Sequence, residues 1–202
     1  MPYFDHSATT PLHPQVIDKM NEVSEFNYGN PSSLYSSGRK SKAIIEKARH
    51  LIAQTIEALA SEIYFTGSGT EANNMVIWSI IYGKKKHIIT SSIEHPAILN
   101  VIEQLEPFGV SCSILQVNSD GQVDPKDLKS AIRHDTGLIS IMLVNNEVGT
   151  IQPIKKLTEI AQKADVPFHS DSVQALGKIP LSVNNIGAQF LSFSGHKFYG
   201  PK

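Results

Sequence analysis

The stretch of residues 138–169, LISIMLVNNEVGTIQPIKKLTEIAQKADVPFH, decides the fold class of this chain. Its apolar run at residues 138–144 predicts a strand, Ile154–Lys163 predicts a helix, and residues 166–169 predict a second strand. A strand, a helix and a further strand in this order place the two strands parallel in one sheet. The stretch therefore predicts an α/β fold.

The same alternation continues on both sides of this stretch. Further strands are predicted at residues 63–65, 87–90, 111–117 and 190–194. Further helices are predicted at residues 42–59, from about Thr70, and at residues 96–105 and 125–133. We therefore expect a mainly parallel sheet flanked by helices, in a chain of 202 residues that is long enough for one sizeable domain.

Composition and charge exclude several classes of function. The chain is 41% hydrophobic and 18% charged, with a formal net charge of -1 and no basic stripe, so nucleic acid is not an expected partner. No apolar run approaches the roughly 18–20 residues that span a bilayer, and the N-terminus lacks a signal-peptide pattern. The single cysteine, Cys112, excludes an intrachain disulfide and a cysteine-rich zinc site. We expect a cytoplasmic protein with no membrane or metal partner.

Polar and glycine-containing groups follow the predicted strands. In parallel α/β sheets, ligands bind outside the carboxyl ends of the strands. This shared placement indicates a ligand site more strongly than any single motif does. The groups lie at residues 67–70, 94–95, 145–147, 171–174 and 194–197.

A glycine turn and a lysine stand out among these groups. The turn in TGSGTEANN, residues 66–74, precedes a predicted helix whose first N–H groups form a site for an anion such as phosphate. A simple turn with Thr70 as the helix N-cap is the alternative. Lys197 follows an apolar strand and is flanked by aromatic residues, so a lowered pKa would leave its amine neutral and able to attack an aldehyde. An ordinary surface lysine is the alternative there.

Two further residues have chemistry that suits a planar cofactor. Asp171 can keep a pyridinium nitrogen protonated, or can simply cap the turn that follows it. His95 can stack on a planar ring or transfer protons, or can simply precede the helix that Pro96 begins.

The same groups occur in the same order in the cysteine desulfurases, and the chain resembles the NifS/IscS-like group of this family over essentially its whole length. The motifs that carry the resemblance are YFDHSATTP at residues 3–11, GNPSS at 29–33, EH at 94–95, NNEVG at 145–149, the pair Asp171 and Gln174, and SGHK at 194–197. Members are class V, fold-type I enzymes that depend on pyridoxal 5'-phosphate (PLP). The resemblance implies that residues 1–202 belong to the large, PLP-binding domain of that fold.

The resemblance also implies a role for each candidate residue. Lys197 would bind PLP covalently and move protons, and His95 would stack on the pyridine ring and act as an acid–base group. Asp171 would pair with the ring nitrogen, Gln174 with the phenolic oxygen, and Asn146 would lie near the cofactor and the substrate carboxylate. Residues 1–40 would include a substrate-side loop. The implied phosphate contacts are Gly69, Thr70, Ser194 and His196.

The implied activity is the removal of sulfur from L-cysteine, which leaves L-alanine and an enzyme-bound persulfide for iron–sulfur cluster assembly or tRNA thiolation. The implied partners are a second copy of the chain, in a homodimer, and a sulfur-acceptor protein. A selenocysteine lyase or another class V activity is the alternative.

Family members are much longer than this chain. We therefore expect the large domain to be incomplete at Lys202, and the small C-terminal domain with its nucleophilic cysteine to be absent. Cys112 lies in a strand-like run and is expected to be a buried structural residue. A catalytically inactive fragment is the alternative to an active desulfurase.

Overall fold

The computed structural model describes residues 2–202, which divide into two compact units. The second unit, Thr66–Leu181 with Asn185–Ser194, holds the sheet. The first unit contains the chain up to Phe65 together with Ser182–Asn184 and Gly195–Lys202. The first unit is therefore built from segments that are far apart in the sequence.

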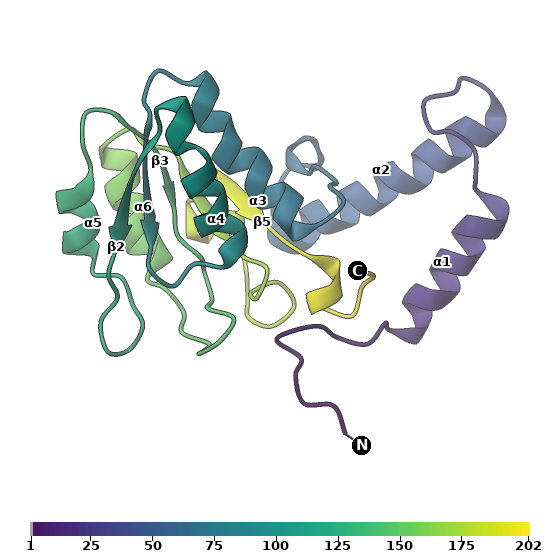
Figure 1. Ribbon diagram of the computed structural model, residues 1–202. Helices are drawn as coiled ribbons and strands as arrows, with labels where there is room; N and C mark the ends of the chain where they lie inside the picture. Colours follow the sequence, from purple (N-terminus) through teal and green to yellow (C-terminus); the bar gives the residue numbers. More distant parts are fainter. Residues whose placement is uncertain (1) are drawn as a thin grey trace. The chain divides into compact units, whose positions relative to one another are not determined.

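The second unit contains a five-stranded parallel sheet in the order β2-β1-β3-β4-β5 (Figure 1). From β1 the chain moves outward to β2, and then returns past β1 to β3 on its other side. The carboxyl ends of β1 and β3 therefore flank the point where the strand order reverses, which is where open α/β sheets bind ligands. The strands are β1 (His87–Ser91), β2 (Ser111–Leu115), β3 (Thr136–Ser140), β4 (Phe168–Asp171) and β5 (Phe190–Ser192).

Helices cover both faces of this sheet with apolar side chains. On one face, α5 (Pro125–Ala131) and α6 (Ile154–Lys163) pack on β1, β2 and β3 through a cluster that includes Leu128, Leu157 and Ile139. On the other, α3 (Gly69–Trp78) and α4 (Pro96–Gln104) pack through a cluster that includes Ile77, Ile98 and Ile88. β1 and β4 are accordingly buried at every residue, whereas the edge strand β2 is largely exposed.

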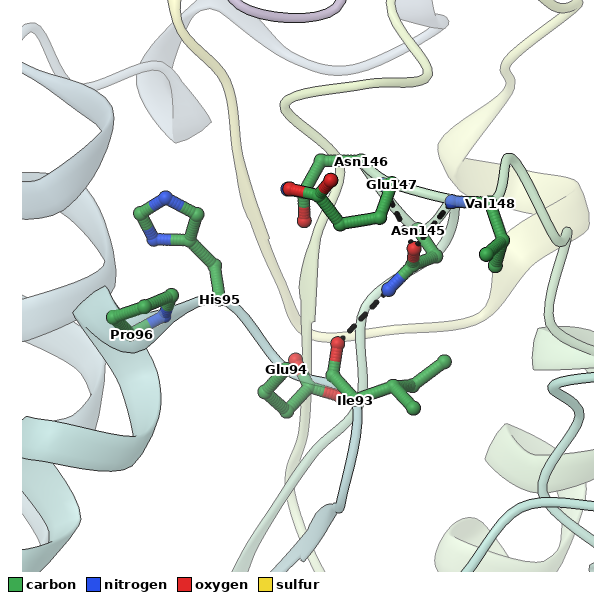
Figure 2. A pocket seen from close by; sticks show the side chains of 8 residues that line it. All are labelled: Ile93, Glu94, His95, Pro96, Asn145, Asn146, Glu147 and Val148. Carbon is green, nitrogen blue, oxygen red and sulfur yellow. Dashed lines mark hydrogen bonds between the residues drawn. The ribbon is translucent and has the colours of Figure 1, made fainter.

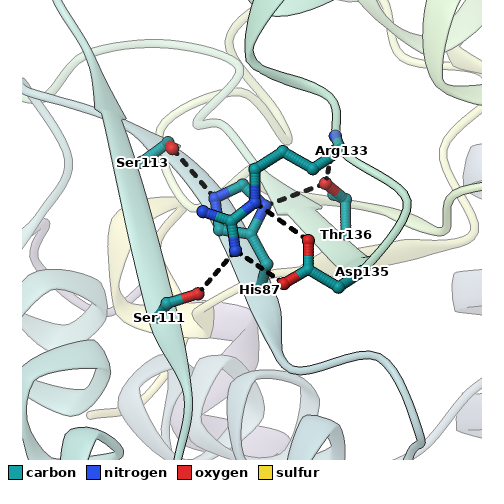
Figure 3. Close-up of polar contacts among 6 residues, drawn as sticks. All are labelled: His87, Ser111, Ser113, Arg133, Asp135 and Thr136. Atoms are coloured by element: carbon teal, nitrogen blue, oxygen red, sulfur yellow. Dashed lines mark hydrogen bonds and ion pairs between the residues drawn. The ribbon is translucent and has the colours of Figure 1, made fainter.

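A polar cluster ties together the amino ends of three neighbouring strands (Figure 3). The fully buried ring of His87 bonds Thr136 Oγ1 through Nδ1 and Ser113 Oγ through Nε2, both at 2.8 Å. Burial lowers the pKa of His87, and positively charged Arg133 lowers it further, while Asp135 opposes both effects. A neutral ring therefore links β1 to the strand on each side of it.

The first unit is mainly helical. It contains α1 (Pro14–Phe26), α2 (Ser36–Ile56), and the short 3-10 helices at Ala60–Glu62 and Gly195–Lys197. The short helix α7 (Val183–Ile186) crosses the boundary between the units along the chain. None of the residues of α1 is buried within this chain.

The predicted fold class is confirmed, and several predicted boundaries are corrected. Residues 63–65 do not form a strand: Tyr64 and Phe65 are exposed and pair with no neighbouring strand. β3 is Thr136–Ser140, whereas the apolar run predicted a strand over residues 138–144. Residues 141–143 are buried and still contact β4: the N–H groups of Ile141 and Leu143 donate to His169 O and Asp171 O at 3.1 and 2.9 Å.

The expectation that Cys112 is buried is wrong. The residue does lie in a strand, but β2 is at the edge of the sheet and Cys112 is exposed. Partial burial of its thiol still raises the pKa to about 11, with a smaller contribution from the negative charge of Glu106.

Among residues 2–202, no helix combines the length and the apolar character needed to cross a bilayer. The same residues contain no group of three or more acidic, histidine or cysteine side chains arranged to hold a metal ion.

Candidate active site

A pocket of about 300 Å³ lies between the segment that follows β1 and the segment that follows β3. Figure 2 shows the two segments facing each other, with His95 and Glu94 on one side and Asn146 and Glu147 on the other. The pocket therefore occupies the point where the strand order of the sheet reverses. Its lining residues are Ile93, Glu94, His95, Pro96, Asn145, Asn146, Glu147 and Val148.

Hydrogen bonds of Glu94 connect the two segments that form the pocket. Its buried carboxylate accepts hydrogen bonds from the backbone N–H of Met142 and from Ser91 Oγ, the latter at 2.5 Å. Burial raises the pKa of Glu94 to about 8, although the hydrogen bonds from Ser91 and Met142 lower it; the negative charge of Asp171 adds to the increase. Sequence reasoning noticed Glu94 only as the neighbour of His95.

Asn145 makes a second connection between the same segments. Its Nδ2 donates to Ile93 O at 2.9 Å, while its Oδ1 accepts from the N–H groups of Glu147 and Val148, each at 2.9 Å. Asn145 is therefore a buried brace, and the half-buried neighbour Asn146 is the asparagine available to a ligand. Asn146 Nδ2 donates to Glu147 Oε1 at 2.7 Å.

His95 is both the N-cap of α4 and a wall of the pocket. Its Nδ1 accepts a hydrogen bond from the Ala97 N–H at 3.0 Å, as expected for a residue that precedes a helix-starting proline. An Nδ1 that accepts is not protonated, so the neutral ring carries its proton on Nε2. The ring of His95 is exposed and can therefore stack on a planar group, while its Nε2 is available for proton transfer.

Asp171 ends β4 with both carboxylate oxygens hydrogen-bonded. Oδ1 accepts from the Val173 N–H at 3.0 Å, and Oδ2 accepts from Asn73 Nδ2 at 2.8 Å. Asp171 and Asn73 are both buried, at 6% and 2% exposure. Asn73 stands inside the glycine-turn motif quoted from the sequence, but no role was expected for it.

The start of α3 approaches the ends of β4 and β5 closely. A Cβ placed on Gly69 would lie 3.2 Å from both Ser194 Cβ and Val173 Cγ2, so only glycine fits there without displacement. The N-cap of α3 is Ser68, whose Oγ accepts from the Glu71 N–H at 3.1 Å, and not Thr70. The first N–H groups of the helix therefore lie beside Ser194, in a position suited to an anion.

Two other buried polar side chains lie close to Asp171 in the sequence. Gln174 is buried and accepts a hydrogen bond from Lys178 Nζ. His169 bonds Ser140 Oγ and Ser192 Oγ, each at 2.9 Å, which links β3, β4 and β5, and full burial lowers its pKa to about 3. His169 is therefore neutral. It lies two residues before Asp171 in β4, so the two side chains are on the same face of the sheet.

Lys197 and His196 belong to the first unit, where they contact the N-terminal segment. Lys197 Nζ donates to Ser7 O at 2.5 Å and to Ala8 O at 2.9 Å. His196 Nδ1 lies 3.1 Å from Thr9 Oγ1, and burial lowers the pKa of His196, with the positive charges of Lys197 and Lys202 contributing less. Residues Gly195–Lys197 of the SGHK motif and the N-terminal motif therefore lie together in the first unit.

The model of the class-V aminotransferase family matches residues 2–202. The chain belongs to this family. Relatives named cysteine desulfurase IscS are 49% identical in Dictyoglomus turgidum and 48% identical in Methanosarcina thermophila, each over 99% of this chain. The match covers 52% and 50% of those two proteins, so the chain spans about half the length of the curated relatives it matches.

Solved structures of class-V proteins have the same fold. One described as SspA in complex with cysteine has a TM-score of 0.97 and 38% identity, over 100% of this chain and 59% of that one. A NifS-like protein has a TM-score of 0.96 and 38% identity, over 99% of this chain and 56% of that one. The resemblance to the NifS/IscS-like group is thereby confirmed.

Proposed function

We propose that this class-V chain binds PLP and supplies the cofactor-binding part of a cysteine desulfurase. The observation that carries the proposal is the buried carboxylate of Asp171 at the end of β4, held by two N–H donors beside the start of α3. An oriented carboxylate can pair with the protonated pyridine nitrogen of PLP, and the free N–H groups at a helix start can bind its phosphate.

The residues that are present fit PLP. A Cβ at Gly69 would be tight, at 3.2 Å from Ser194 Cβ and Val173 Cγ2, so glycine lets the start of α3 pack closely on the segments that follow β4 and β5. The two N–H donors leave each carboxylate oxygen of Asp171 a further lone pair that can accept a ring N–H. When bound, PLP would supply an electron sink for bond cleavage at the α-carbon of an amino acid.

We assign the other candidate residues as follows. His95 presents Nε2 for proton transfer and its ring for stacking, and Gln174 hydrogen-bonds the phenolic oxygen. Asn146 orients the substrate carboxylate, and Lys197 bonds the aldehyde carbon and moves protons. The phosphate contacts are Gly69, Thr70, Ser194 and His196.

The proposed substrate is L-cysteine, with L-alanine and transferable sulfur as the products. The names of the relatives and the cysteine-bound SspA structure support this substrate. We further propose a homodimer in the cytoplasm that passes sulfur to an iron–sulfur scaffold or a tRNA-thiolation protein. A selenocysteine lyase would use the same cofactor residues, so comparing L-cysteine with L-selenocysteine distinguishes the two activities.

The decisive experiment is borohydride reduction of the PLP-loaded protein, followed by peptide mapping. The pyridoxyl group should be found on Lys197, and Lys197→Ala should prevent its incorporation. A label on Lys178 or Lys202 would contradict the assignment, and Lys178→Ala serves as the matched control.

A further inference from the structure

Asn73 connects the helix that starts at Gly69 to the carboxylate at the end of β4. It lies one turn into α3 and donates from Nδ2 to Asp171 Oδ2 at 2.8 Å. The amide cannot be reversed without pointing Oδ1 at the carboxylate, where two acceptors would repel each other. Asn73 Oδ1 is buried and has no hydrogen-bond partner among residues 2–202. Within the described residues, the hydrogen bond to Asp171 is therefore the only one that this buried amide group makes.

This contact controls two properties of Asp171. The terminal torsion of an aspartate is broad, but one donor on each oxygen, Asn73 on Oδ2 and Val173 on Oδ1, holds the carboxylate plane in a single orientation. Each oxygen keeps a second lone pair for a further donor. The donors also stabilise the anion, and so oppose transfer of a proton to Asp171 from a group that it binds.

We propose that Asn73 is a positioning residue for the cofactor: it orients Asp171 and keeps the shared proton on the pyridine nitrogen of PLP. The proposal rests on the proposed PLP function. α3 would then serve both ends of the cofactor, with its first turn at the phosphate and its second turn, through Asn73 and Asp171, at the ring nitrogen.

The test is nitrogen NMR of the full protein loaded with PLP that is labelled with 15N at the ring nitrogen. Asn73→Leu removes the donor at similar volume and should move the proton equilibrium by about tenfold or more toward the carboxylate, because hydrogen bonds to charged groups are strong. The 15N signal should shift toward that of unprotonated PLP. Asp171→Ala defines the limit of that shift.

Asn74→Leu is the matched control, because Asn74 is the next residue of α3, carries the same amide and makes no described contact with Asp171. It should leave the 15N signal at the wild-type position. Asn73→Ala, measured in parallel, covers the case in which leucine prevents folding, as judged by circular dichroism.

Two results would overturn the proposal, and they are distinguishable. If Asp171→Ala shifts the signal while both Asn73 variants leave it unchanged, Asn73 is a structural residue and the PLP function stands. If the wild-type protein retains no labelled PLP, both the proposed function and the role of Asn73 fail.

Discussion

Both carboxylate oxygens of Glu94 accept a hydrogen bond from one backbone group, the N–H of Met142, at 3.0 and 3.1 Å. This contact holds the segment that carries His95 against the extension of β3. It places an ionisable group at 5% exposure beneath the pocket, where burial raises its pKa to about 8. The geometry of the pocket is therefore coupled to pH through Glu94.

Glu94→Gln should remove a pH dependence of stability. The pKa of Glu94 is higher in the folded than in the unfolded protein, so between about pH 4.5 and 8 the folded state binds more protons. The stabilisation is full below pH 4.5 and is lost as the pH rises to about 8. Urea unfolding at pH 5 and pH 8.5 should show the wild type losing stability relative to Glu94→Gln. Glu147→Gln changes an exposed residue of the same pocket and should lose as much stability between these pH values as the wild type does. If Glu94→Gln lost stability to the same extent, Glu94 would not be the group responsible for the pH dependence.

Gly69→Ala should weaken PLP binding. The added Cβ would lie 3.2 Å from Ser194 Cβ and from Val173 Cγ2, so these side chains or the start of α3 must move by a few tenths of an ångström at the proposed phosphate position. Overpacking of this kind costs about 1–3 kcal/mol. Fluorescence titration with PLP measures the change in Kd. Gly83→Ala is the control, since its Cβ would meet only ordinary contacts at 3.4 Å; equal Kd values for both variants would contradict the phosphate assignment.

The sequence predicted the sheet better than the first unit. Adjacent apolar residues, Ile88 with Ile89 and Ile114 with Leu115, marked β1 and β2, and Pro96 and Pro125 marked two helix starts, because these signals are local. α1 was not predicted, although it too begins at a proline, Pro14; none of its residues is buried within this chain.

The sequence predicted the place in the fold of two candidate residues. Asp171 ends β4, and His95 lies in the segment that follows β1. Asn73 and Asn145 were missed because their roles come from contacts across 98 and 52 residues of sequence. A single sequence shows that an asparagine is present, but not that it is buried against a carboxylate.

His95→Ala should slow alanine formation by about 10²–10⁴-fold, the usual scale for loss of a general acid–base group. His95→Gln keeps a polar side chain but cannot titrate, so it should lose proton transfer as well. Steady-state rates at several pH values measure both. Normal rates in both variants, with only a lower Tm from loss of the α4 cap, would restrict His95 to a structural role.

Asp171→Ala should lower kcat far more than it weakens PLP retention. The proposed phosphate contacts and Lys197 would remain, while the group that stabilises the protonated ring would be lost. Bound PLP, counted after gel filtration, and kcat should be measured on the same sample. Asp165→Ala, a change to an exposed acidic residue, is the control; near-normal kcat in Asp171→Ala would assign the ring nitrogen to another group.

Cys112 should not act as the sulfur nucleophile. A thiol with a pKa of about 11 carries roughly 100-fold less thiolate at neutral pH than one with the ordinary value of 9.0. Alkylation by iodoacetamide at pH 7 should be correspondingly slower than for a free cysteine, even though the residue is exposed on the edge strand β2. Cys112→Ser should therefore leave the rate of alanine and sulfide formation from L-cysteine unchanged in the PLP-loaded protein. Rapid alkylation of Cys112, together with loss of sulfide release in Cys112→Ser, would instead make this thiol the group that receives the sulfur.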